Sequence, residues 1–118
     1  LVFADGVGMR LAGRILRQPI VDNVNGSDLF PRLCAALDCS RSLYLLGARP
    51  GVADAVARWV RRHYPTIDVR GTQHGYFEPH EEREVIARIA AASPDVLLVA
   101  LGVPRQDLWI RHHLLELN

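Results

Sequence analysis

The chain has 118 residues, of which 49% are hydrophobic and 23% are charged. This composition is that of a folded globular domain and excludes a disordered, collagen-like or coiled-coil chain, and the length favours one domain with one core. The formal net charge is +1, and all 14 basic residues are arginines. No overall electrostatic field therefore recruits nucleic acid, and no lysine is present to serve a P-loop or a Schiff base.

Short apolar runs alternate along the chain with segments of helical period. The apolar runs predict strands at Leu1–Ala4, Ser42–Gly47, Ile67–Val69 and Val96–Leu101. The periodic segments predict helices at Gly6–Leu16, Ser27 or Asp28 to about Asp38, Pro50 or Gly51 to His63, Glu81–Ala92 and Arg105–Asn118. In the helix that ends at His63, the residues expected to face the core are Val52, Val56, Trp59 and Val60. We expect the strand Val96–Leu101 to be fully buried because its apolar run is continuous, and no apolar run is long enough to span a bilayer.

Strands that alternate with helices predict an α/β fold, with a Rossmann-like, mostly parallel sheet covered by helices on both faces. Ligands of such sheets bind outside the carboxyl ends of the strands. The segments expected at this edge are all rich in glycine and polar residues: Asp5–Gly8, Gly47–Pro50, the loop Gly71–Pro79, and Gly102–Gln106.

The first of these segments has two glycines, Gly6 and Gly8, but Leu11 stands where the dinucleotide fingerprint has its third glycine. The pattern therefore argues against NAD or FAD and for a tight turn whose free N–H groups can meet a phosphate. Asp5 precedes this turn directly. It has two open interpretations, an N-cap carboxylate or a general base in the cleft.

Two later segments carry side chains that generic loop chemistry does not require. In Gly75-Tyr76-Phe77, an aromatic ring at the edge of the sheet can stack on a base. After Gly102, Arg105 and Gln106 stand where the phosphate or sugar of a ligand would lie. No metal site is predicted, because there is no Asp-x-Asp motif and the two cysteines have no partner pair.

At these residues the sequence resembles the WecG/TagA/CpsF glycosyltransferases, glycosyltransferase family 26. The resembling pieces keep the order of the family and a compatible spacing across essentially the whole chain, and the Leu-Gly-x-Pro-x-Gln pattern is the most specific of them. They are Ala4–Gly8, Val24–Leu29, Leu45–Ala48, Gly75–Phe77 and Leu101–Ile110.

The resemblance implies an inverting, metal-independent enzyme that needs no cofactor. Such enzymes transfer N-acetylmannosamine or a related sugar from a UDP-sugar to an undecaprenyl-diphosphate-linked acceptor, in the synthesis of teichoic acid or other cell-surface polysaccharides. By position, Asp5 would be the general base, Gln106 would contact a sugar, and Tyr76 would lie against the uracil. The predicted substrate-binding set is completed by Gly6, Gly8, Gly102 and Arg105. The resemblance also implies a peripheral association with the inner face of the bacterial membrane. The two unpaired cysteines favour the cytoplasm, the net charge predicts no nucleic-acid partner, and a homo-oligomer stays an open alternative.

Some positions depart from the family pattern. Asn23 stands where the family often has an arginine, and Arg14, Arg49 or Arg105 would have to replace that charge; Asp107 stands where the family usually has glutamate. The upstream Thr-x-Asn strand and the downstream Arg-rich tail of the family are absent, so we expect a chain truncated at both ends. The alternatives are a non-catalytic UDP-sugar-binding module or an inactive fragment, and, less favoured, an unrelated Rossmann oxidoreductase.

Overall fold

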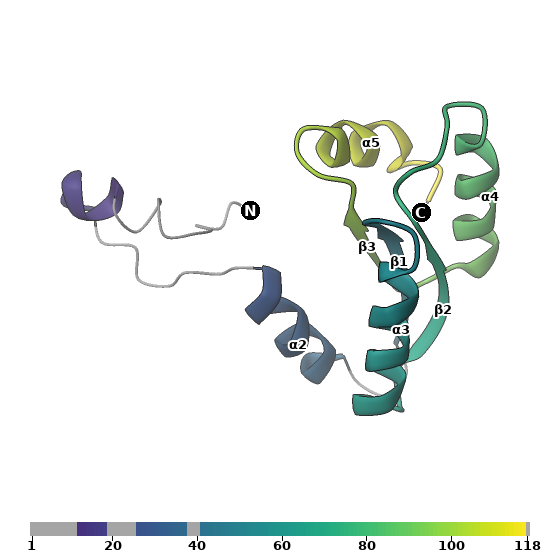
Figure 1. Cartoon of the computed structure of the whole chain (residues 1–118), viewed down its shortest axis with the longest axis horizontal. Coiled ribbons are helices and arrows are strands. Elements are labelled where there is room, and N and C mark those ends of the chain that lie inside the picture. The colour runs from purple at the N-terminus through teal and green to yellow at the C-terminus, as the bar shows by residue number, and fades with distance from the viewer. Residues whose placement is uncertain (1–11, 19–25, 38–40, 118) are drawn as a thin grey trace. The chain divides into compact units, whose positions relative to one another are not determined.

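The computed structural model describes residues 12–18, 26–37 and 41–117, and the chain divides into two compact units, residues 1–36 and 37–118 (Figure 1). In the first unit, a helical turn occupies residues 12–15 and helix α2 spans Gly26–Ala36. The predicted strand Leu1–Ala4 lies outside the described residues, as does the beginning of the predicted helix Gly6–Leu16. No helix in the described ranges is long and apolar enough to cross a membrane.

The second unit is a parallel sheet with helices between its strands. Its elements are β1 (Ser42–Gly47), α3 (Val52–His63), β2 (Asp68–Gln73), α4 (Glu82–Ala92), β3 (Val96–Ala100) and α5 (Arg105–His113). The strand order is β2-β1-β3, and both neighbours of β1 run parallel to it. The predicted α/β, Rossmann-like class is therefore confirmed, with β1 at the centre of the sheet and buried along its whole length.

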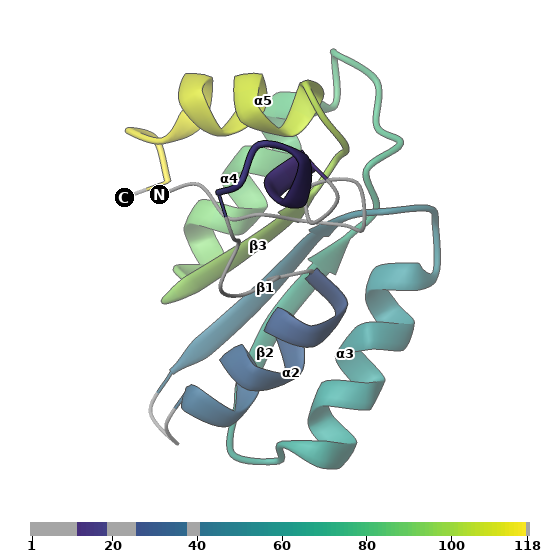
Figure 2. The same cartoon turned by 90° about the vertical axis from the view of Figure 1, so that its left-hand side faces the viewer.

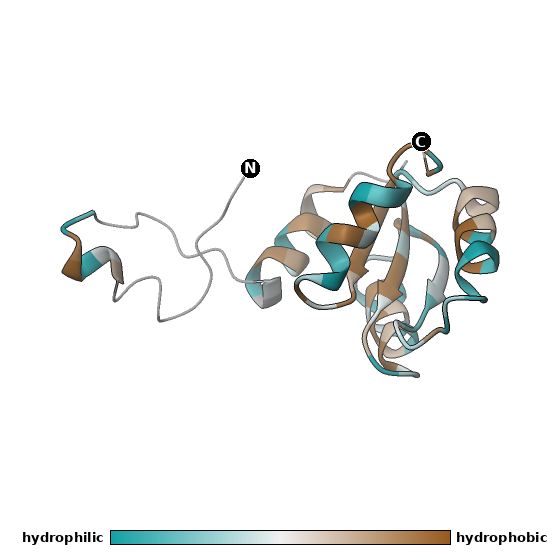
Figure 3. Ribbon diagram, turned by 90° about the horizontal axis from the view of Figure 1, so that it is seen from above, coloured by the Kyte–Doolittle hydropathy of each residue, from teal (hydrophilic) through white to brown (hydrophobic). Residues whose placement is uncertain are grey.

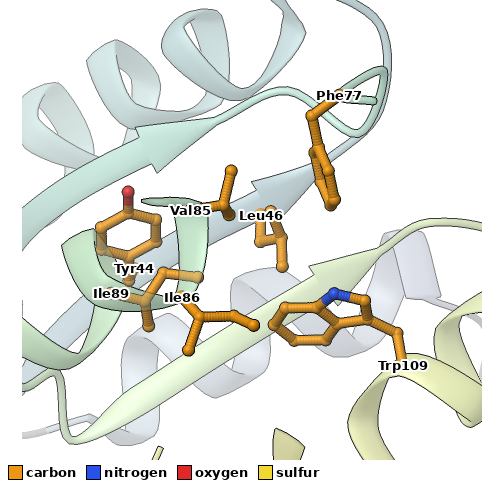
Figure 4. Packing of buried hydrophobic residues seen from close by; sticks show 7 residues of the cluster. All are labelled: Tyr44, Leu46, Phe77, Val85, Ile86, Ile89 and Trp109. Atoms are coloured by element: carbon orange, nitrogen blue, oxygen red, sulfur yellow. The ribbon is translucent and has the colours of Figure 1, made fainter. Parts of the chain in front are cut away.

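Helices cover both faces of this sheet (Figure 2). Helix α3 packs on β1 and β2 from one side, while α4 and α5 close the other side over a hydrophobic cluster (Figure 4). The cluster consists of Tyr44, Leu46, Phe77, Val85, Ile86, Ile89 and Trp109. Hydrophobic residues are concentrated in β1 and β3, whereas β2 and the helices mix hydrophilic and hydrophobic residues (Figure 3).

The core face of α3 differs from the prediction. The buried residues of the helix are Ala53, Ala57 and Val60, while Val52 and Trp59 are 44% and 37% exposed. Alanines on the contact face let the helix approach the sheet closely, so the bulkier residues turn toward the solvent. Trp59 instead stacks on the ring of His63, with 4.8 Å between the ring centroids.

Strand β2 extends to Gln73, three residues into the segment predicted as a loop. Its pairing with β1 shifts between Leu43 and Tyr44, so that Tyr44 pairs with Gly71. A Cβ atom at Gly71 would lie 2.4 Å from the Tyr44 ring, so any larger residue would clash with that ring. The strand can continue here because glycine leaves room for the ring.

Two further expectations need correction. Residues Val96–Val99 of β3 are half-buried rather than fully buried, because β3 is an edge strand of the sheet that the described residues form. Helix α5 ends at His113 instead of continuing to Asn118.

Candidate functional site

The loops that follow the three strands are joined to one another by backbone hydrogen bonds at the carboxyl edge of the sheet. The Ala48 N–H donates to the carbonyl of Ala100 (2.8 Å), and the Gly75 N–H donates to the carbonyl of Ala48 (2.9 Å). Three of the four predicted ligand segments therefore meet at one edge. The fourth, with Asp5, Gly6 and Gly8, lies outside the described residues.

The turn after β1 requires a glycine for two independent reasons. Gly47 has φ +127°, and a Cβ atom there would lie 2.3 Å from the carbonyl oxygen of Ala100. The close approach brings the ends of β1 and β3 together and lets Ala48, itself at φ 59°, donate to Ala100. Gly47 is therefore needed to bring the carboxyl ends of β1 and β3 together.

The two aromatic residues of the loop after β2 have opposite environments. Phe77 is 7% exposed and belongs to the hydrophobic cluster, whereas the neighbouring Tyr76 is 66% exposed. Burial of Phe77 anchors the loop, and Tyr76 is left with a free aromatic surface at the edge where ligands of parallel sheets bind. The expectation that the core needs neither ring of this loop is therefore wrong for Phe77, whose ring packs in the cluster, and it holds for Tyr76.

Arg105, the first residue of α5, reaches back to this loop. Its Nη1 donates to the carbonyl of Gly75 (2.8 Å), and its guanidinium carbon lies 5.0 Å from the centroid of the Phe77 ring, in cation–π geometry. The predicted substrate-binding arginine is therefore in contact with the loop that carries Tyr76.

The start of α5 also positions Gly102 and Gln106. Gly102 has φ +79°, a Cβ atom there would meet open space, and its carbonyl accepts a hydrogen bond from the Gln106 N–H (2.8 Å). The Gln106 side chain is half-buried in the first turn of the helix. Both predicted residues thus lie at the same edge as Arg105. Arg49, one of the arginines considered as a replacement for the family's charge, is exposed in the loop after β1.

A pocket of about 510 Å³ adjoins Arg105 between the beginning of α4 and α5. Its lining residues are Glu82, Pro104, Arg105, Leu108, Trp109, His112 and His113. A second pocket of about 350 Å³ shares two of these residues and is lined by Phe77, Pro79, Glu82 and Arg105. Across the larger pocket, His113 Nε2 lies 3.4 Å from Glu82 Oε1.

Of the residues that line this pocket, the predicted site included only Arg105, and only the α5 residues have a signal in the sequence. Its α5 residues follow the i, i+3, i+4, i+7 spacing of one helix face from Arg105 to His112, which is the signal that predicts a shared surface. The contribution of Glu82 has no such signal, because it comes from another helix.

Comparisons with known proteins agree with the resemblance found in the sequence. The profile of the "Glycosyl transferase WecG/TagA/CpsF family" matches residues 1–118. A relative from Bacillus spizizenii (strain ATCC 23059 / NRRL B-14472 / W23) is 31% identical over 113 residues, which are 95% of this chain and 43% of the relative. Relatives from Bacillus subtilis (strain 168) and Staphylococcus aureus (strain NCTC 8325 / PS 47) are 29% and 31% identical, again over 95% of this chain.

All three relatives are named N-acetylglucosaminyldiphosphoundecaprenol N-acetyl-beta-D-mannosaminyltransferase. The chain spans less than half the length of each, 43% or 44%.

Proposed function

The chain belongs to the WecG/TagA/CpsF glycosyltransferase family, and on this basis we propose that the protein transfers N-acetylmannosamine or a related sugar from a UDP-sugar to a sugar linked to undecaprenyl diphosphate. The family match over the whole chain carries the proposal. The names of the relatives support both the sugar and the acceptor, because they are mannosaminyltransferases that act on N-acetylglucosaminyldiphosphoundecaprenol.

The geometry of the carboxyl edge supports the binding of a nucleoside diphosphate sugar. In the proposal, the exposed Tyr76 ring lies against the uracil, since an aromatic side chain can stack on any base. Gln106 contacts a sugar from the first turn of α5. The predicted donor site also includes Gly6, Gly8, Gly102 and Arg105.

The proposed reaction is a single displacement. Asp5 accepts the proton of the acceptor hydroxyl while the hydroxyl oxygen forms a bond to the anomeric carbon of the donor. The bond from that carbon to the β-phosphate oxygen breaks, and its electron pair leaves with UDP, so the configuration at the anomeric carbon inverts. Backbone N–H groups of the turn from Gly6 to Gly8 stabilise the charge on the leaving diphosphate, and the proposed reaction uses neither a metal ion nor a cofactor.

The acceptor sets where the protein works. A polyprenyl chain holds its diphosphate-linked sugar at the surface of a membrane, so the proposal includes a peripheral association with the inner face of the cell membrane. A homo-oligomer remains compatible with this arrangement.

The test is a transfer assay on the full-length protein with UDP-N-acetylmannosamine and a short-chain prenyl-diphosphate-linked N-acetylglucosamine, read by product mass. Substitution Asp5→Asn should lower kcat by about 10²- to 10⁴-fold if Asp5 is the general base. Asp68→Asn is the control, because that side chain is 67% exposed at the start of β2, at the opposite edge of the sheet. Normal turnover by Asp5→Asn would leave Asp5 as an N-cap only, and UDP binding without any transfer by the wild type would indicate a binding module.

A further inference from the structure

We propose that Arg105 is a positioning residue for the nucleotide base: it holds the Gly75–Phe77 loop so that Tyr76 presents its ring, and it does not contact the phosphates. This inference rests on the proposed function and assigns a specific role to one residue of its site. An arginine at a nucleoside diphosphate site usually binds a phosphate group, and the proposed role of Arg105 is different.

The first support is what the guanidinium group already contacts. Nη1 donates to the Gly75 carbonyl at 2.8 Å, and the guanidinium carbon lies over the buried Phe77 ring, 5.0 Å from its centroid. A carbonyl oxygen and the face of an aromatic ring are both electron-rich, so together they hold the cation in place. These contacts join the residues on either side of Tyr76 to the beginning of α5.

The second support is that the rest of the loop is fixed as well. The Gly75 N–H is bound to the Ala48 carbonyl, so both backbone groups of Gly75 have protein partners. On the other side, Phe77 packs in the cluster with Trp109 (Figure 4). Tyr76 lies between two anchored residues, and its own side chain is exposed. Ordering the loop before the ligand arrives removes an entropic cost from binding.

The third support is the charge around Arg105. Glu82, whose Oε1 also lies 3.4 Å from His113 Nε2, lines both pockets that Arg105 lines, and its carboxylate repels a phosphate group. The same carboxylate does not oppose an uncharged base stacked on Tyr76. The surroundings of Arg105 therefore suit a structural cation better than a phosphate ligand.

Binding of uridine and of UDP separates the two roles, because uridine has the base and no phosphate. Dissociation constants of both ligands are measured by NMR titration of the full-length protein. We expect Arg105→Ala to weaken uridine and UDP by the same factor, about fivefold or more, since base stacking on an aromatic side chain is worth at least that much. Arg105→Lys should restore most of the affinity, because an ammonium group can also bind a carbonyl and lie over a ring. Weakened UDP binding with unchanged uridine binding would overturn the inference and make Arg105 a phosphate ligand.

Arg111→Ala is the matched control. Arg111 is an exposed arginine on the same helix and does not line either pocket beside Arg105, so its loss should leave both constants unchanged. If Arg105→Ala does not fold, as judged by its thermal midpoint, Arg105→Gln takes its place. That variant keeps a donor for the Gly75 carbonyl but has no charge to place over Phe77.

A double-mutant cycle with Tyr76→Ala tests whether Arg105 acts through Tyr76. The double variant should bind uridine no more weakly than Tyr76→Ala alone, because a loop without the ring gains nothing from being held. Additive losses would overturn the inference while leaving the proposed function intact. Wild-type protein that does not bind UDP, or Tyr76→Ala that binds it normally, would instead contradict the base-binding part of the proposed function.

Discussion

Ser42 and Asp95 are joined in both directions at the amino ends of β1 and β3. The backbone N–H and the hydroxyl of Ser42 both donate to Asp95 Oδ2, at 2.8 and 2.6 Å, and the Asp95 N–H donates to Ser42 Oγ at 2.9 Å. These hydrogen bonds hold the amino ends of the two strands together. The hydrogen bond from Ala48 to Ala100 holds the carboxyl ends, so the pairing of β1 with β3 is fixed at both ends.

The first prediction concerns pH. Hydrogen bonds from Ser42, with a smaller contribution from Arg41, lower the pKa of Asp95 from 3.8 to about 2. The folded state therefore binds the proton less readily than the unfolded state, so this contribution to stability is present above about pH 4 and is lost as the pH falls toward about 2. Urea-unfolding midpoints measured from pH 5 to 2 should fall less steeply for Asp95→Asn than for the wild type.

Arg41→Ala provides a graded comparison for that measurement. It removes the partner whose Nη1 lies 3.3 Å from Asp95 Oδ1 and leaves the bonds from Ser42 in place. Its pH dependence should lie between those of the wild type and Asp95→Asn, close to the wild type. Parallel curves for the wild type and Asp95→Asn would show that Asp95 does not carry this linkage.

The second prediction compares two glycines that share a positive φ. Gly51→Ala, at φ +84° with nothing within 4 Å of the added Cβ, should cost about 1–2 kcal/mol from backbone strain alone. Gly47→Ala adds a clash with the Ala100 carbonyl and should cost about 1–3 kcal/mol more. Free energies of unfolding in urea measure both, and equal losses would mean that the end of β3 moves away without cost.

The third prediction concerns the contact between α4 and α5. His113 lies 3.4 Å from Glu82 and packs its ring against Trp109, with 5.1 Å between the centroids. His113→Ala should therefore destabilise the protein by about 1 kcal/mol more than His112→Ala, because His112 is exposed and its hydrogen bond stays within its own helix. Thermal unfolding of the two variants makes the comparison, and a larger loss for His112→Ala would show that the adjacent pocket depends on the other histidine.

The fourth prediction tests the proposed sugar contact of Gln106. Gln106→Ala should lower kcat/KM for transfer by about two- to tenfold, the usual effect of one hydrogen bond, and leave the affinity for UDP unchanged. The thermal midpoint should stay close to that of the wild type, because the side chain is half-exposed. Loss of UDP affinity by the same factor would show that Gln106 contacts the nucleotide instead of the sugar.

Much of the fold and part of the site follow from local sequence. The continuous apolar run of β1 and the periodic apolar residues of α4 specify their elements, because a central parallel strand and an amphipathic helix each bury a fixed pattern of side chains. Glycine and polar residues after the strands likewise place Tyr76, Gly102, Arg105 and Gln106 at the carboxyl edge, since the polarity of parallel strands leaves no other place for these loops.

Tertiary contacts decide what local patterns cannot. Whether Val52 or Ala53 of α3 faces the sheet depends on how closely the helix can approach, and the extension of β2 through Gly71 depends on the ring of Tyr44. The partner of Arg105 lies 30 residues away at Gly75, so the sequence predicts a cation at the site without showing what that cation contacts. Such pairings arise only when the strands are assembled, because they join groups that no local periodicity relates.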